Sequence, residues 1–469
     1  MNRLAAPWTR PGALYSAPGR FILKLELGEA PERIPTLHTA MALGLPVIER
    51  TGVGPVDRVL NHLCPHRRVT SVFAPAPSNR GASGGFDDVE HALGMSRTYR
   101  VETDPTVPID DVVDALRQVG VVESATPQYL VTAPMSVMAE PVTAPQEPWA
   151  PWEQVRGVEA MAYEPGDPAV VVGVLDTGVV ADHPELGANL RTGVDTVQLG
   201  SAHLGVGLRI LGDTATPDTQ PDDEVGHGTS CAAIIGGAGR NVAPGLAWGC
   251  GLVAARVLGS AGFEGRRDRI GVGAIDDIDA GMKWLVDLGA VVLNMSFGTP
   301  DGSLSANDPR PHTDVVQYAL ARGCVLVAAS GNSGRPERYS PACLPGVIAV
   351  GSVDPEDRPS AFSTSGEHVH VAAPGERVAT ATRDGYGHVT GTSFASPFVA
   401  AAAALLVSRA RRRAHVIAPG LIADVLGASA RPWAAGTPDG HGAGILDVHT
   451  ALALLDHRID RGPPPGGGP

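Results

Sequence analysis

Charged, aromatic and cysteine residues are all scarce in this chain of 469 residues. Charged residues make up 18% of it and aromatic residues 4%, while 58 glycines and 41 prolines imply many tight turns. The 36 lysines and arginines are outnumbered by 50 aspartates and glutamates, so the net charge is −14. Because a nucleic-acid footprint needs a basic face, no nucleic-acid partner is expected. The 43% hydrophobic content supports a large core in a globular chain of two or three domains.

Cysteine chemistry is limited by number and spacing. The five cysteines are odd in number and far apart, which excludes a disulfide framework and a metal quartet. His62, Cys64 and His66 stand close together, but the neighbouring Pro65 and Arg67 favour an exposed helix end over a metal site. No metal ligands and no cofactor are therefore assigned.

Export and membrane signals are also lacking. Prolines and arginines interrupt the first 30 residues, so the apolar core of a signal peptide is missing. The longest unbroken apolar run, residues 398–407, is too short to span a bilayer. The sequence predicts a cytoplasmic protein without a membrane partner, and leaves secretion by another route open.

The N-terminal part predicts a small α+β domain. Residues 1–18 have no periodicity and are expected to be a flexible tail, and residues 19–131 carry the order strand, helix, strand, strand, helix, strand. This is the split βαβ order of a ferredoxin-like unit. Residues 132–147 are rich in proline and predict an exposed linker open to proteolysis. The expected strands are 21–27, 69–73, 98–102 and 121–131, and the expected helices are 56–63 and 109–119.

Residues 148–456 have a different pattern, in which short aliphatic runs alternate with helical stretches. Such runs are typical of strands buried on both faces of a parallel sheet, so we expect a doubly wound, mostly parallel α/β domain. Ligands bind such sheets outside the carboxyl ends of the strands. Residues 457–469 are expected to be a disordered tail rich in proline and glycine. The expected strands are 169–175, 251–258, 290–295, 324–329, 347–350 and 369–373, and the expected helices include 274–288 and 314–321.

A serine stands at the start of the most apolar helix that the sequence predicts, over residues 392–412. Ser393 would lie where the first free N–H groups and the positive end of the helix dipole favour an anion. A capping serine and a nucleophile look alike at such a position. Pro397 is interpreted as a first-turn proline and Ser396 as packing beside it.

Reactive residue types follow the other predicted strands. Asp176 comes directly after the first strand of the sheet, His227 lies between two glycines, and Asn332 follows the fourth strand. An acid, a histidine, an amide donor and a serine on one face are the groups needed for acyl transfer. His227 would take the proton of the serine hydroxyl, and Asp176 would hold the ring tautomer.

Five segments of the chain closely resemble the subtilisin-like serine proteases, the subtilases, in residues, order and spacing. The resemblance implies a catalytic triad of Asp176, His227 and Ser393, with Asn332 as oxyanion donor, and cleavage of a protein or peptide substrate. Calcium is common in that family, but no ligand spacing assigns it here. The segments are 174–178, 226–229, 294–298, 329–332 and 391–397, and the residues implied to line the substrate pocket are Ser296, Phe297, Gly298, Ala329, Ser330 and Gly331.

The N-terminal region resembles, more loosely, the inhibitory propeptide of the same family. This implies an intramolecular partner that assists folding and blocks the cleft until the linker is cut by the enzyme itself. The absence of a leader sequence leaves open whether this domain is removed.

Three other hypotheses fit parts of the sequence. Asp176-Thr177-Gly178 is also the tripeptide of aspartic proteases, which need a second such motif and an all-β fold. The only Gly-x-Ser-x-Gly, residues 81–85, has no strand before it, which argues against an α/β-hydrolase. A catalytically silent binding or regulatory protein on the subtilase fold is the third.

An acidic loop precedes His227. It would attract a basic substrate residue or a cation, or be a solvated turn. Its acids are Asp213, Asp218, Asp222, Asp223 and Glu224.

Overall fold

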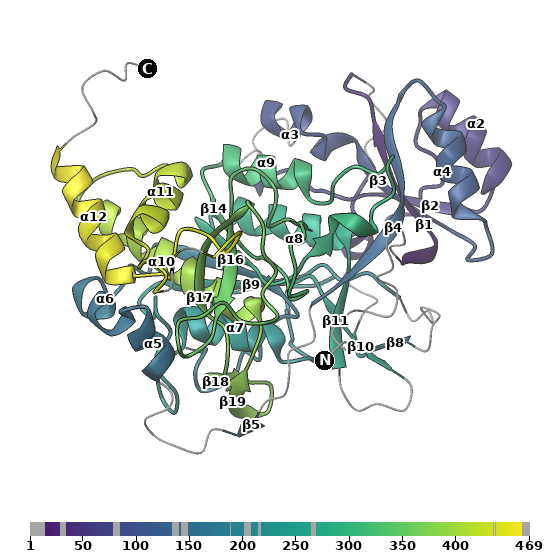
Figure 1. Cartoon of the computed structure of the whole chain (residues 1–469). Helices are drawn as coiled ribbons and strands as arrows, with labels where there is room; N and C mark the ends of the chain where they lie inside the picture. The colour runs from purple at the N-terminus through teal and green to yellow at the C-terminus, as the bar shows by residue number, and fades with distance from the viewer. Residues whose placement is uncertain are drawn as a thin grey trace.

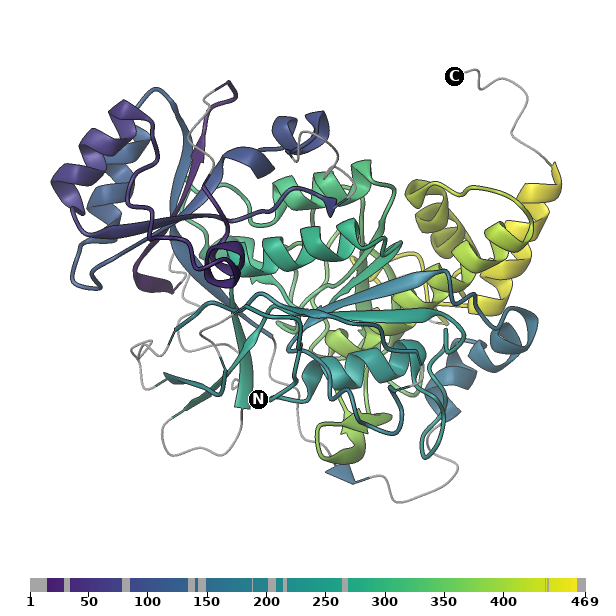
Figure 2. The same ribbon diagram turned by 180° about the vertical axis from the view of Figure 1, so that it is seen from behind.

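The structure is a computed structural model. It describes residues 15–28, 34–77, 85–133, 140–141, 149–187, 189–200, 208–213, 217–263, 269–434, 436 and 438–461. The N-terminal elements lie at one end of the molecule and the C-terminal helices at the other, with a parallel sheet between them (Figures 1 and 2).

The central sheet is parallel throughout, with the order β17-β16-β14-β12-β6-β9-β7. Each aliphatic run expected to be a strand forms one, which confirms the doubly wound α/β architecture. The strands are β6 (Val171–Asp176), β7 (Val194–Asp195), β9 (Gly251–Arg256), β12 (Val292–Met295), β14 (Val325–Ala329), β16 (Val347–Val353) and β17 (Val369–Pro374).

Helices cover both faces of this sheet. Alternate residues of a strand point to opposite faces, so Val172 and Val174 of β6 join one apolar cluster while Val171 and Leu175 join the other. The first cluster contains α7 (His227–Gly236), α10 (Thr392–Arg412), α11 (Pro419–Ser429) and α12 (Val448–Arg461), and the second contains α8 (Ile275–Asp287) and α9 (Thr313–Ala321).

Helix α10 spans Thr392–Arg412, as the sequence predicts, and runs through the middle of the first cluster. Of the described helices, it alone is long and apolar enough to pass for a membrane span, but 94% of that stretch is buried inside the protein. It is therefore a core helix, and the arginines at its end suit the negative pole of the helix dipole.

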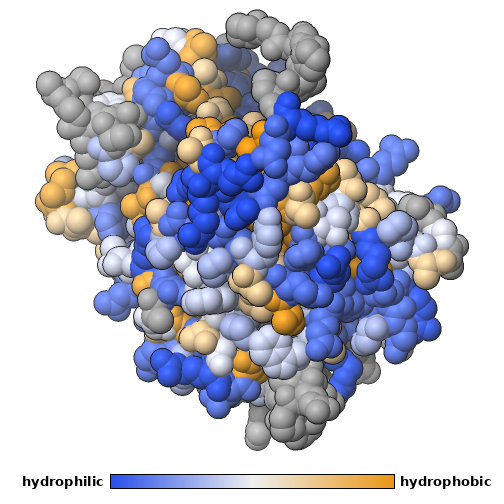
Figure 3. All heavy atoms as spheres, turned by 90° about the vertical axis from the view of Figure 1, so that its left-hand side faces the viewer, coloured by the Kyte–Doolittle hydropathy of each residue, from blue (hydrophilic) through white to orange (hydrophobic). Residues whose placement is uncertain are grey.

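The face formed by the C-terminal helices is mostly hydrophilic, with apolar residues scattered over it (Figure 3). Helix α12 accounts for this because its apolar residues Val448, Ala451, Leu452 and Leu455 are turned inward. Smaller helices α5 (Ala150–Gln154) and α6 (Gly157–Tyr163) lie beside it (Figure 1).

The N-terminal domain has the expected ferredoxin-like arrangement. Its antiparallel strands are ordered β2-β3-β1-β4, and the helices α2 and α4 pack on them. An excursion between β2 and β3 carries α3 and packs Val72, Phe73 and Met95 into the second cluster of the central domain. The elements are β1 (Ser16–Leu25), α1 (Leu37–Ala42), α2 (Gly54–Leu63), β2 (Arg67–Ser71), α3 (Asp88–Ala92), β3 (Thr98–Thr103), α4 (Ile109–Arg117) and β4 (Val122–Thr132).

The two domains share a sheet. Strand β4 runs on from the N-terminal domain and pairs antiparallel with β11 (Arg269–Ala274), which continues into β10 (Gly259–Phe263) and β8 (Leu208–Leu211). The N-terminal domain is thus joined to the central domain by backbone hydrogen bonds as well as by side chains.

Described elements cross the expected boundaries of the two tails and of the linker. Strand β1 begins at Ser16, inside the expected tail of residues 1–18, and α12 continues to Arg461, past the expected boundary at 456. Within the expected linker, Glu140–Pro141 form β5, which pairs with β19 (Gly385–Val389). Strand β4 also runs into the expected linker as far as Thr132. Linker residues 134–139 and 142–147 lie outside the described residues, as do residues 81–84 of the Gly-x-Ser-x-Gly motif and residues 462–469.

Candidate active site

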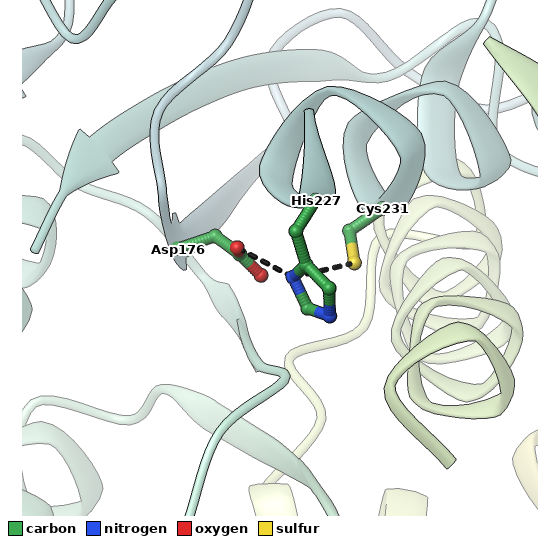
Figure 4. Close-up of side chains that lie close together, drawn as sticks. All are labelled: Asp176, His227 and Cys231. Atoms are coloured by element: carbon green, nitrogen blue, oxygen red, sulfur yellow. Dashed lines mark hydrogen bonds and ion pairs between the residues drawn. The ribbon is translucent and has the colours of Figure 1, made fainter. Parts of the chain in front are cut away.

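An aspartate and a histidine meet at the carboxyl edge of the central sheet. Asp176 is the last residue of β6, and His227 is the first residue of α7. Nδ1 of His227 lies 2.7 Å from Oδ1 of Asp176, and both side chains are buried (Figure 4). An ionised carboxylate only accepts hydrogen bonds, so this contact places a proton on Nδ1.

The other ring nitrogen of His227 has no hydrogen-bond partner among the described residues. With Nδ1 protonated and the ring neutral, Nε2 carries the lone pair that can accept a proton. The ring of Phe394 lies 5.2 Å from the imidazole and covers part of it. The imidazole is therefore held in one tautomer with its basic nitrogen free.

Cys231, one turn along α7, is a third member of this cluster that the sequence did not single out. Its Sγ lies 4.0 Å from Nδ1 of His227 (Figure 4). Burial raises the pKa of Cys231 to about 11, so the thiol is neutral at ordinary pH. The only signal in the sequence is its spacing of four residues from His227, which puts both on one helix face.

The Asp176 carboxylate makes His227 more basic. Burial by itself would lower the pKa of His227, but the charge and hydrogen bond of Asp176 outweigh it and raise that pKa well above its ordinary value of 6.5. Because the Cys231 thiol is neutral, Asp176 is the charged neighbour that matters.

The resemblance to subtilases implies peptide hydrolysis with His227 as base, so we expect the acid limb of kcat/KM against pH to lie above pH 6.5, because a protonated His227 cannot take a proton. An Asp176→Asn variant keeps the burial but loses the negative charge, so its limb should move to lower pH. Measuring kcat/KM for one peptide against pH in both proteins checks this. A wild-type limb at or below 6.5, or an unchanged limb in the variant, would contradict it.

Ser393 is the second residue of α10 and is buried. Its Oγ donates a hydrogen bond to the backbone oxygen of Ser296, at 3.2 Å. No hydrogen bond to His227 is formed, since Nε2 is without a partner in the described part of the chain. In this structure the serine thus lies beside the aspartate–histidine pair without being bonded to it.

The backbone oxygen of Ser393 is held by side chains. Pro397 lies in the second turn of α10, not in the first as expected, so its missing N–H leaves the oxygen of Ser393 without the usual helical partner. Oγ of Ser296 donates to that oxygen at 2.7 Å, and Sγ of Cys231 at 3.4 Å. Because Pro397 leaves this oxygen free to accept them, these two hydrogen bonds connect Ser393 to the residue after β12 and to α7.

Ser396 also differs from its expected role. Its Oγ donates to Oδ1 of Asn294 at 2.8 Å, and Nδ2 of Asn294 donates to Oγ of Ser296 at 2.9 Å. It belongs to the hydrogen-bond network beneath Ser393 rather than only packing beside Pro397.

Asn332 is fixed by the first residue of α10. Its Oδ1 accepts hydrogen bonds from the backbone N–H and the hydroxyl of Thr392, at 3.0 and 2.8 Å. This leaves Nδ2 facing the preceding Gly391, where an added Cβ would lie 3.4 Å from it. Gly391 has φ +150°, which L side chains rarely adopt, so glycine is required there. The amide donor and the N–H of Ser393 therefore lie at the same helix start.

Asp223, one of the acids expected to bind a basic substrate residue or a cation or to lie in a solvated turn, is buried. Its carboxylate accepts hydrogen bonds from the N–H of Gly226 at 2.7 Å and from the hydroxyls of Thr177 and Thr229 at 2.8 and 2.6 Å. It joins the chain after Asp176 to the start of α7. The position of an acid just before a helix start was the available signal.

The acidic loop is consequently less free than expected. Asp223 is buried, and Glu224 is paired with Arg256 at 3.2 Å. The hypothesis of a basic substrate residue therefore loses Asp223 and Glu224 as binding groups.

Comparison with known proteins shows which family has this arrangement of residues. The model described as "Subtilase family" matches residues 167–442, which contain all of the side chains above. The chain belongs to the subtilase family. This subtilase is therefore a serine-type endopeptidase by family.

Named relatives agree with this membership. The subtilase is 32% identical over 317 residues to the thermophilic serine proteinase of Bacillus sp. (strain AK1), covering 66% of this chain and 69% of that protein. It is 32% identical over 288 residues to thermitase of Thermoactinomyces vulgaris, covering 61% and 91%. A solved protease structure from Pseudoalteromonas arctica PAMC 21717 matches with a TM-score of 0.54 and 25% identity, over 66% of this chain and 97% of that one.

Proposed function

We propose that this subtilase hydrolyses peptide bonds with Ser393 as nucleophile, His227 as general base and Asp176 as the orienting carboxylate. The observation that carries the proposal is the Asp176–His227 contact of 2.7 Å, with Nε2 left without a partner among the described residues. Oγ of Ser393 would turn from the oxygen of Ser296 toward Nε2. Catalytic hydrogen bonds are often long or unformed until substrate is bound.

The reaction then follows from these positions. Oγ of Ser393 attacks the carbonyl carbon as its proton moves to Nε2 of His227, and Asp176 stabilises the imidazolium. Nδ2 of Asn332 and the N–H of Ser393 stabilise the oxyanion. The imidazolium donates its proton to the leaving amine, which leaves an acyl-enzyme that water hydrolyses by the same steps.

The N-terminal domain is proposed to inhibit this site. Its last strand, β4, pairs with the edge of β11 that β10 leaves open. The N–H of Ala133 also donates to the oxygen of Gly271 at 3.0 Å. A Cβ added at Gly271 would lie 3.3 Å from Cβ of Ala133 and 2.6 Å from Cγ2 of Thr177, next to Asp176. An extended substrate would bind such an edge in the same way, so β4 and a substrate compete for it.

Two backbone pairings support self-cleavage between Ala133 and Glu140. Before this interval β4 is paired with β11 beside Thr177, and after it β5 is paired with β19, which leads into Ser393. The ends of this interval are thus held by strands that adjoin two of the proposed catalytic residues, Asp176 and Ser393. The interval proposed for the cleavage site, between Ala133 and Glu140, is shorter than the linker of residues 132–147 expected from the sequence.

Purified wild-type protein should therefore separate into two fragments, the second beginning within residues 134–140, because both ends of this interval pair with strands next to proposed catalytic residues. Intact mass after incubation measures this, with Ser393→Ala as the control that should remain one chain. A new N-terminus outside residues 134–140 would contradict the proposed cleavage interval. Peptide hydrolysis by an uncut wild-type chain would instead make the N-terminal domain a permanent subunit.

A further inference from the structure

A tyrosine lies between the two segments that are proposed to line the pocket for the residue before the cleaved bond. Ser296–Gly298 follow β12, and Ala329–Gly331 end β14, its parallel neighbour. A Cβ added at Gly331 would lie 2.8 Å from Cδ2 of Tyr339, and one added at Gly298 would lie 3.3 Å from Cδ1 of the same ring. Opposite edges of one ring therefore face the two walls.

The backbone of Tyr339 is attached to one of these walls. Tyr339 and Ser340 form β15, which pairs antiparallel with Thr299 and Pro300, directly after Gly298. Any movement of the ring out of the space would have to occur about its side-chain bonds, because the strand itself is held. The ring is thus a fixed part of this space rather than a residue of a distant loop.

The hydroxyl end of Tyr339 is also constrained. Burial, and next the negative charge of Glu337, raise the pKa of Tyr339 to about 12, so the hydroxyl stays neutral. Thr364 also borders Gly331, because its Oγ1 would lie 2.9 Å from a Cβ added there. The side chain that lies between the two walls is therefore aromatic and neutral.

We propose that Tyr339 limits the residue before the cleaved bond to small side chains, of the size of glycine, alanine and serine. This inference rests on the proposed function, because it concerns the pocket of the same active site. A tyrosine ring fills most of the volume that a large side chain of the substrate would need. An alanine methyl group fits beside it, whereas leucine or phenylalanine would have to displace it.

The test compares peptides that differ only at this residue, carrying Gly, Ala, Leu or Phe. The enzyme is produced as the full chain and allowed to process itself. The concentration of active sites is then measured by titration with a fluorophosphonate. We expect kcat/KM of the wild type to be about tenfold or more higher for Ala than for Leu or Phe. In Tyr339→Ala, kcat/KM for Leu and Phe should rise by about tenfold or more, while Tyr339→Phe should keep the wild-type profile because the ring remains.

Tyr163→Ala is the matched control. Tyr163 is half exposed on α6, far in the chain from the pocket segments, and its loss should leave the profile unchanged. A wild type that prefers Leu or Phe, or a Tyr339→Ala variant with the wild-type ratio, would overturn the inference and leave the proposed function standing. No labelling and no hydrolysis of any peptide would refute the proposed function, and the inference with it.

Discussion

The Ser393→Ala variant is expected to lose peptide hydrolysis, fluorophosphonate labelling and self-cleavage together. Its fold should persist, because the backbone oxygen of Ser393 keeps its contacts with Ser296 and Cys231, and the hydroxyl loses only one hydrogen bond, to the backbone oxygen of Ser296. Without Oγ there is no acyl-enzyme, so the loss in kcat/KM should be at least about four orders of magnitude.

Ser396→Ala is the matched control on the same helix. It removes a hydroxyl that bonds to Asn294 and leaves Oγ of Ser393 in place, so labelling should continue. The expected cost is a loss of stability of about 1 kcal/mol. Labelling that persists in Ser393→Ala but disappears in Ser396→Ala would move the nucleophile to Ser396. A wild type that is not labelled at all would favour the catalytically silent binding protein, and labelling that persists in both variants would place the nucleophile at another residue.

The fold could be predicted because its elements are determined by local patterns. A strand buried on both faces must be aliphatic throughout, as Val171–Asp176 and Val325–Ala329 are, and a helix buried on every side must be apolar all round, as α10 is. The Asp176–His227 contact could be predicted from the topology, because residues that follow parallel strands lie at the same edge of the sheet.

The contacts that support the site could not be predicted in the same way. The oxygen of Ser393 is available only because Pro397 lies one turn further on, and Ser296, which binds it, is 97 residues away. No periodicity relates these residues. Asp223 looked like one more acid in a polar loop, and only its burial in the structure distinguishes it from its neighbours.

The register between domains is a second feature beyond the reach of the sequence. Strand β4 is among the segments expected to be extended, whereas β11 is not, and the pairing of Val131 with Gly273 depends on how the two domains dock. Docking in turn depends on buried charges that look like ordinary surface residues in the sequence. Among these are Arg100, Glu90 and Lys283.

Arg100 is the charge on which this docking depends most. It comes from β3 of the N-terminal domain and pairs with Asp276 and Asp277 at the start of α8, and all three side chains are nearly inaccessible to solvent. Arg100→Ala would leave two carboxylates buried without their cation. Removing one partner of a buried pair costs about 3–5 kcal/mol, so we expect a large fall in the unfolding temperature. Thermal unfolding in the Ser393→Ala background measures it without self-cleavage.

The pH dependence of this defect separates a lost charge from lost packing. Burial already raises the pKa of Asp277 to about 7 against the opposing charge of Arg100, and removing Arg100 should raise it further. A carboxyl with a raised pKa in the folded state binds protons on folding, so the variant should gain stability as the pH falls and lose it as the pH rises through 7 and above. Arg50→Ala is the control for this prediction. Arg50 is an exposed arginine of the same domain, so its replacement should change the free energy of unfolding by no more than about 0.5 kcal/mol. If Arg100→Ala unfolds at the same temperature as this control, the buried pair does not hold the domains together. A defect that is equally large at every pH would mean that the loss of packing, and not of charge, is responsible.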